Sequence, residues 1–401
     1  MPQATVRSSI RQSQSWRSSA LAAALFAMVA VALPAGAGLP SGEAAAQQQD
    51  PGPCPLAGVT DRSIDGFLTH DELRDRLERL PRQTQGRVKV DLIGHSHQGR
   101  EIWSATVGHG DKVILAQSEI HGNEKHGTRA LLTVLRQLAN NSQASQLIRE
   151  QVTFVAIPKM NPDGGELNRR QNDMPWDDVV ELYPQLAGAP RSVYYSNFAG
   201  GFDLNRDYTP YMDYEPDPAD LPGSATVPPG GLWITPEARA VREVYRQLEA
   251  EHGIVDVFAD LHNQGACSLR TYPDGRHWTT ISITAGLNDP PPPEFPHWDW
   301  DASRRANVIV AQAIEQLDPP FNRPSIYRLS QTTWGSSTVM AGARGSARVL
   351  FEVSGQTQQI GDFEQGSLER QIVVGLLALA DHLANDTFDD IDPELYSLIA
   401  P

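Results

Sequence analysis

The stretch Ile120-His121-Gly122-Asn123-Glu124 follows the apolar run Lys112-Val113-Ile114-Leu115-Ala116, which is typical of a buried strand. A strand that ends in His-x-x-Glu brings an imidazole and a carboxylate, three residues apart, to the same edge of a sheet. Nitrogen and oxygen ligands of this kind suit a zinc ion, which prefers a tetrahedral set of such donors. The spacing alone occurs by chance in many chains, so the rest of the sequence must decide whether His121 and Glu124 are ligands.

The length and charge of the chain limit its architecture and its partners. The 401 residues are enough for one large domain or two modest ones, and no internal repeat or linker divides them. We therefore predict a single catalytic domain. The net charge of −16 repels nucleic acid and anionic membrane surfaces, so neither is an expected partner.

Residues 1–46 have the layout of a secretory signal peptide and leader. Arg7, Arg11 and Arg17 precede an apolar run, residues 20–33, which is followed by the candidate cleavage sites Ala35-Gly36-Ala37 and Ala44-Ala45-Ala46. The run of about fourteen residues is shorter than the roughly twenty that a spanning helix needs. We expect an exported protein, secreted or periplasmic, without stable membrane insertion; a retained anchor is the alternative.

After the leader we predict a short N-terminal segment at residues 47–65, a catalytic domain at 66–385 and a C-terminal tail at 386–401. The short segment leaves no room for a long folded pro-segment. Cys54 and Cys267 are the two cysteines, and the sequence leaves open whether they form a disulfide. Two cysteines are too few for a zinc–thiolate site, so His and carboxylate side chains must hold any metal.

Strands and helices alternate along the chain. This order predicts an α/β fold: a single domain with a mixed, mainly parallel twisted sheet covered by helices on both faces. Thr69 and Glu72 predict a capping box, and Pro81 is expected to end that helix. The expected strands are 87–93, 102–107, 112–121, 152–157, 254–262 and 348–353; the expected helices are 68–81, 127–138, 235–252, 302–317 and 372–383; residues 172–201 and 209–232 are expected to be irregular.

Further polar clusters lie beyond the ends of strands, where open parallel sheets place their ligand sites. Glu352 has apolar neighbours on both sides, and burying its carboxylate would be costly without a partner or a role. Read alone, His262 is a structural histidine. For Glu352, an edge strand on which the side chain faces water is the alternative. For His95 and His97, a solvated turn is the favoured interpretation, and a pair of metal ligands is the alternative. The clusters are Asn161-Pro162-Asp163-Gly164, Arg169-Arg170-Gln171-Asn172, residues 201–208, residues 261–265 and Phe351-Glu352-Val353.

Taken together and in this order, the motifs resemble those of carboxypeptidase A-like zinc peptidases, including bacterial members, over residues 66–383. The resemblance implies one Zn²⁺ per chain, held by His121, Glu124 and His262 with a water in the open position. It implies that Glu352 is the general base and later the proton donor to the leaving amine.

The same resemblance gives roles to four residues around the metal. Arg170 would stabilise the oxyanion, with Arg169 as the fallback. Asn205 and Arg206 would bind the terminal carboxylate of the substrate. Asp203 would orient His121.

Two positions depart from the family pattern. Asn123 stands where the animal digestive members have an arginine, as in many bacterial relatives. The mobile active-site tyrosine is missing from residues 335–346, and Tyr327 lies too far upstream to be given that role.

The sequence thus predicts a zinc carboxypeptidase that releases C-terminal residues from peptides with a free carboxylate. One alternative keeps the metal chemistry but changes the substrate: an amidase or endopeptidase on cell-wall peptides, or a deacylase of N-acyl amino acids. The deacylases are usually shorter and lack the N-terminal helix and hairpin. A binding module without activity is the other alternative, although it would need no general base at Glu352.

Overall fold

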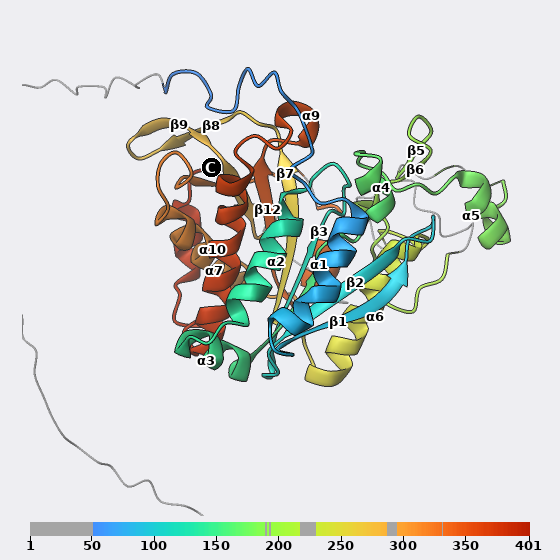
Figure 1. Cartoon of the computed structure of the whole chain (residues 1–401), viewed down its shortest axis with the longest axis horizontal. Coiled ribbons are helices and arrows are strands. Elements are labelled where there is room, and N and C mark those ends of the chain that lie inside the picture. The colour runs from blue at the N-terminus through green and yellow to red at the C-terminus, as the bar shows by residue number, and fades with distance from the viewer. Residues whose placement is uncertain (1–50, 189–190, 192–193, 217–229, 287–294, 331) are drawn as a thin grey trace, which may run out of the picture. The chain divides into compact units, whose positions relative to one another are not determined.

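An eight-stranded mixed sheet forms the centre of the fold (Figure 1). Four neighbouring strands, β4, β3, β7 and β12, run parallel, whereas β1 pairs with β2, β2 with β4 and β10 with β12 in antiparallel fashion. The predicted mixed, mainly parallel sheet is confirmed. In spatial order the strands are β1 (Val88–His95), β2 (Glu101–Val107), β4 (Val152–Ile157), β3 (Lys112–Ser118), β7 (Val257–Gln264), β12 (Ala347–Ser354), β10 (Ile281–Thr284) and β11 (Pro324–Ile326).

This computed structural model describes residues 51–401 apart from 189–190, 192–193, 217–229, 287–294 and 331. The described residues fall in one compact unit, Gln48–Pro401. The predicted signal peptide and leader lie outside the described residues.

Both faces of the sheet are buried. Because side chains alternate along each strand, each strand contributes to a core on either face. In β3, Ile114 and Ala116 join the core on one face, whereas Val113 and Leu115 join the core on the other. The first core includes residues of α1 (His70–Gln83), α2 (His126–Leu138), α3 (Gln143–Gln151), α7 (Trp300–Glu315) and α10 (Gln365–Ala384), which are labelled in Figure 1. The second includes residues of α6 (Pro236–His252), α8 (Ser337–Ala343) and part of the chain before α6.

Helix α1 begins as predicted and ends later than predicted. Thr69 and Glu72 form the capping box. The helix continues past Pro81 to Gln83, so the prediction that Pro81 ends it is wrong. Proline removes one backbone donor, but it stands so near the end that the helix loses a single hydrogen bond there.

The segments expected to be irregular contain short ordered elements. In residues 172–201, Trp176 and Val179 of α5 (Trp176–Leu182) are buried, and Trp176 stacks on Phe202. Tertiary packing rather than periodicity stabilises this helix. The remaining short elements are α4 (Pro162–Glu166), η1 (Pro184–Leu186), β5 (Tyr195–Ser196), β6 (Gly201–Phe202), η2 (Leu204–Arg206), the hairpin of β8 (Ser268–Tyr272) and β9 (Gly275–Thr279), and α9 (Thr357–Ile360).

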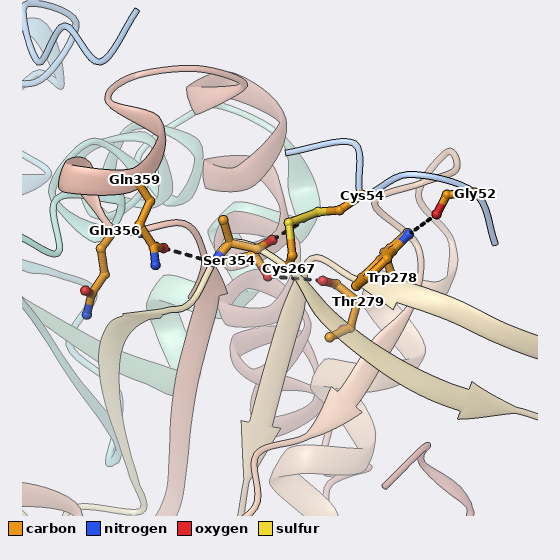
Figure 2. Close-up of a disulfide and its surroundings, with 9 residues drawn as sticks. Gly52, Cys54, Cys267, Trp278, Thr279, Ser354, Gln356 and Gln359 are labelled. Atoms are coloured by element: carbon orange, nitrogen blue, oxygen red, sulfur yellow. Dashed lines mark hydrogen bonds between the residues drawn. A yellow bond between two sulfur atoms is a disulfide. The ribbon is translucent and has the colours of Figure 1, made fainter. Parts of the chain in front are cut away.

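Both ends of the described chain are attached to the fold. Cys54 is joined to Cys267 by a disulfide, the pairing that the sequence had left open (Figure 2). At the other end, η3 (Pro393–Leu398) packs against α7, and the amide of Ile326 donates to the carbonyl of Ala400 over 2.7 Å. Among the described residues, no helix is long and apolar enough to cross a bilayer.

Candidate active site

The turn that carries His121 and Glu124 connects β3 to α2 and packs tightly against α4. A Cβ atom on Gly122 would lie 2.0 Å from the carbonyl carbon of Gly164, so this close backbone contact requires glycine. Asn161 caps α4 and donates from Nδ2 over 3.2 Å to the carbonyl of the residue before His121. The Asn-Pro-Asp-Gly cluster therefore holds the turn in place.

The three predicted ligands converge on one point. Nδ1 of His121 lies 3.0 Å from Oε2 of Glu124. Nδ1 of His262, from β7, lies 2.9 Å from the same oxygen and 3.1 Å from Nδ1 of His121. All three residues are buried, with exposed fractions of 2, 2 and 3% for His121, Glu124 and His262.

A second carboxylate holds each imidazole from behind. Nε2 of His121 lies 3.1 Å from Oδ1 of Asp203, and Nε2 of His262 lies 3.0 Å from Oδ2 of Asp260. A proton on each Nε2 leaves the Nδ1 lone pair as the acceptor that can bind a metal; Nη1 of Arg170 lies 3.2 Å from Nδ1 of His121. The carboxylate of Glu124 is itself held, because the amide of the residue after His262 donates to Oε2 over 3.1 Å.

This donor set fits a zinc ion. Tetrahedral zinc with bonds of about 2.0–2.1 Å keeps its ligand atoms roughly 3.3 Å apart, close to the separations between the two Nδ1 atoms and the Glu124 oxygen. Two imidazole lone pairs and one carboxylate that point to the same place repel one another. A cation between them would be attracted by all three. Burial alone would raise the pKa of Glu124, but the imidazoles of His121 and His262 outweigh it and lower that pKa.

Asp260 is a site residue that sequence reasoning missed. Because side chains alternate along a strand, Asp260 and His262 lie on the same face of β7, two residues apart. That spacing was the signal that could have revealed it. Its Oδ2 also accepts a hydrogen bond from the Ser337 hydroxyl, which fixes the carboxylate against α8.

Glu352 lies beside the metal ligands on the neighbouring strand. In the parallel pairing of β12 with β7, Glu352 is the register partner of His262, and its side chain lines the same cavity. Burial raises the pKa of Glu352 to about 8, and the nearby negative charge of Glu124 adds to this shift. A bound cation would lower the pKa of Glu352 again, because it favours the charged carboxylate.

The structure distinguishes the two candidate arginines. Nη2 of Arg170 donates to Oδ2 of Asp203 over 2.9 Å, and its Nη1 lies 3.7 Å from the Glu124 carboxylate. Arg169 instead donates to the Ala199 carbonyl over 2.6 Å and pairs with Asp173. Arg170 therefore faces the ligands, whereas Arg169 holds the loop.

Asn205 and Arg206 belong to η2 and line the cavity with Arg170. Oδ1 of Asn205 accepts a hydrogen bond from the amide of Ser337 over 3.0 Å, and its Nδ2 lies 3.3 Å from Nε2 of His262. Arg206 Nη1 donates to the Asn205 carbonyl over 2.6 Å. Within the described ranges Arg206 forms no ion pair, so its charge is available to an anionic ligand.

One cavity of about 450 Å³ joins these groups, and Tyr327 lines it as well. The negative charge of Glu352, which lines the same cavity, and burial together raise the pKa of Tyr327 to about 12. Sequence alone left Tyr327 without a role, because its distance from Glu352 along the chain carried no signal. The amide of Tyr327 donates to the carbonyl of Ile283 over 2.8 Å, and this places the ring beside the sheet.

The other histidine pair does not join the site. Nε2 of His97 lies 2.7 Å from Asp178, and His95 ends β1. Asp163 binds Arg100 over 2.6 Å and so secures the turn between β1 and β2. His95 is exposed, whereas His97 is partly buried by its pairing with Asp178, so the predicted solvated turn is solvated only in part.

Comparison with known proteins gives the family. The family model described as "Zinc carboxypeptidase" matches residues 73–360. Carboxypeptidase SOL1 of Arabidopsis thaliana is 25% identical over 116 residues, which are 27% of this chain and 24% of that protein. The match thus spans about a quarter of the plant relative.

Solved structures share the fold. A bovine thrombin-activatable fibrinolysis inhibitor, in complex with a tick carboxypeptidase inhibitor, superposes with a TM-score of 0.55 at 13% identity, over 80% of this chain and 98% of that one. Carboxypeptidase A from Helicoverpa armigera gives 0.53 at 17% identity, over 80% and 76%. Since the family model covers well over half of the sequence, the chain belongs to the zinc carboxypeptidase family.

Proposed function

We propose that this protein, loaded with zinc, hydrolyses peptide bonds and releases C-terminal residues from peptides with a free carboxylate. The observation that carries the proposal is the shared cavity, in which the buried carboxylate of Glu352 lies beside three convergent ligands and two arginines. Glu352 is the register neighbour of His262, and no side-chain hydrogen bond engages it within the described residues. A purely structural carboxylate would need such a partner.

The residues around the ligands divide the reaction between them. Zinc held by His121, Glu124 and His262 would polarise the scissile carbonyl and lower the pKa of the attacking water. Glu352 takes the proton of that water and later delivers it to the leaving amine. Arg170, held by its pairing with Asp203, donates to the oxygen on which negative charge develops.

The carboxylate end of the substrate is assigned to the wall made by η2. The guanidinium of Arg206 can form a bidentate pair with a carboxylate, and Asn205 stands next to it with one amide oxygen already engaged by Ser337. Tyr327 lies on the same cavity, where its hydroxyl can donate to the substrate. These contacts would favour the last residue of a chain over an internal one.

We also propose that the protein is exported. The disulfide between Cys54 and Cys267 supports this, because such bonds persist in oxidising compartments. The proposed partners are peptides rather than nucleic acids or membranes, in keeping with the net charge of −16.

Digestion of a mixed peptide library tests the reaction, with mass-spectrometric readout in the presence and absence of a chelator. We expect stepwise loss of C-terminal residues that the chelator stops. Internal cleavage would favour an endopeptidase, and release of acyl groups alone would favour a deacylase. Binding without any turnover, with or without added zinc, would favour the inactive module.

Arg206→Ala tests the terminal contact. We expect KM for free-carboxylate peptides to rise about 30-fold, since a charge-assisted contact is lost, with little change for the amidated forms of the same peptides. Wild-type protein that prefers the amidated peptide would contradict the exopeptidase proposal.

A further inference from the structure

The β8–β9 hairpin stands between the catalytic cavity and the N-terminal segment. Cys267, just before β8, is bonded to Cys54, and Nε1 of Trp278 in β9 donates to the carbonyl of Gly52 over 3.0 Å (Figure 2). The hairpin is thus fastened at both strands. It lies directly after the ligand-bearing strand β7 in the chain, so its position is tied to the site.

Alternation along β8 gives the hairpin one face toward the cavity. Ser268 and Arg270 both line the cavity, and they are two residues apart on the strand. On the opposite face Leu269 is the register partner of Trp278, which packs against the main core. The side chain of Arg270 is therefore directed to the cavity by the same pairing that fixes the hairpin.

Arg270 has no carboxylate partner in the part of the chain that the structure describes. Its Nη1 donates only to the neighbouring carbonyl of Leu269, over 3.2 Å, and its Nε is buried without a partner. The nearest acidic residue of the hairpin, Asp274, is already engaged by Arg323 over 2.8 Å. A second arginine, Arg328, lies near enough for its positive charge to lower the pKa of Arg270, although burial contributes more to that shift.

A guanidinium that lines a cavity and has no carboxylate partner among the described residues favours an anion beside it. Arg270 lies on β8, whereas Asn205 and Arg206 lie on η2, so these residues reach the cavity from different elements of its wall. With the terminal carboxylate assigned to Arg206, the substrate can extend only upstream from the scissile bond. The outer wall near Arg270 is then the place for an upstream side chain.

Resting on the proposed function, we propose that Arg270 is a specificity residue: it selects peptides that carry an acidic side chain upstream of the scissile bond. The carboxylate of a glutamate or aspartate would pair with the guanidinium of Arg270, and the positive charge of Arg328 would add to the attraction. The disulfide-fastened hairpin holds Arg270 in position for this contact.

The experiment compares peptides that differ only in one upstream residue, glutamate, glutamine or lysine, placed in turn at the two positions before the scissile bond. All have a free carboxylate and the C-terminal residue that the library shows to be released best. We expect the zinc-loaded wild type to show a kcat/KM for a glutamate peptide about tenfold above that for its glutamine counterpart, at one position. Raising the salt concentration should reduce this ratio.

The same ratio of kcat/KM values is measured for variants of Arg270. A general loss of folded protein does not change this ratio. R270Q should bring the ratio close to one, R270K should retain part of it, and R270E should favour the lysine peptides. R276Q is the matched control, because Arg276 is exposed on the same hairpin and does not line the cavity; it should keep the wild-type ratio.

A wild-type ratio near one at both positions, or an unchanged ratio in R270Q, overturns the role of Arg270 and leaves the proposed function standing. Failure of the zinc-loaded wild type to release residues from any peptide overturns both.

Discussion

The inner wall of the cavity and its outer rim are built in different ways. The inner wall consists of His121, Glu124 and His262 with Asp203 and Asp260 behind them; the three ligands are at most 3% exposed, and each has a second partner. The rim is the β8–β9 hairpin, whose side chains are largely half-buried or exposed and which a single disulfide fastens to the N-terminal segment. The buried sheet thus fixes the residues that carry the chemistry, whereas the half-exposed hairpin combines the packing of Trp278 with a covalent link.

The largest expected effect is on the inner wall. Glu352→Gln should lower kcat by about 10³-fold, because the side chain keeps its shape but can no longer accept a proton. Zinc content should stay near one per chain, since Glu352 is not a ligand. Steady-state kinetics and metal analysis on the same preparation check both; normal turnover would remove Glu352 from the mechanism.

The rim should respond in stability rather than in metal binding. Joint replacement of Cys54 and Cys267 by serine should lower the free energy of unfolding by about 3 kcal/mol, a typical contribution for a disulfide, because the bond restricts the unfolded chain. Chemical denaturation at matched zinc load measures this. If the zinc affinity fell together with the stability, the separation between the two regions would not hold.

A smaller effect is expected behind the ligands. Asp260→Asn should weaken zinc binding by roughly 10–100-fold, because the amide orients the His262 imidazole less strongly than the carboxylate. Asp274→Asn on the rim is the control and should leave the affinity unchanged. Competition with a chelator of known affinity gives both constants; equal affinities for wild type and Asp260→Asn would deny Asp260 its orienting role.

The last effect concerns a buried carboxyl that, unlike Glu124, forms no ion pair with any of the described residues. Glu237 is fully buried on α6 and accepts hydrogen bonds from the His97 amide and Asn172. Burial raises the pKa of Glu237 to about 7. Its stabilising contribution is therefore complete below its unfolded pKa of 4.5 and is lost as the pH rises through about 7.

In the Glu237→Gln variant, the fall in unfolding free energy between these two pH values should disappear. We expect the difference in unfolding free energy between variant and wild type to change by up to about 3 kcal/mol across that range. Thermal unfolding at a series of pH values measures it, and parallel curves for the two proteins would show that the carboxyl does not titrate there.

Much of the fold could be predicted because the signals were local. The apolar run before His121, the capping box at Thr69 and the apolar neighbours of Glu352 each depend on residues within a few positions. The prediction that Pro81 ends its helix was wrong, although it also used a local signal. The effect of proline on a helix is real, but it is small at this position because Pro81 stands near the helix end.

The sequence by itself determined the strand-and-helix order and the candidate ligands, because hydrophobic periodicity and the types of side chain beyond strand ends are readable from neighbouring residues. Only the tertiary structure decided that Asp260 supports His262, that Tyr327 joins the cavity, that Arg170 rather than Arg169 faces the ligands and that Cys54 meets Cys267. These contacts depend on strand register and on the packing of loops over the sheet. Residues such as His121 and His262, 141 positions apart, meet only when the whole sheet has formed.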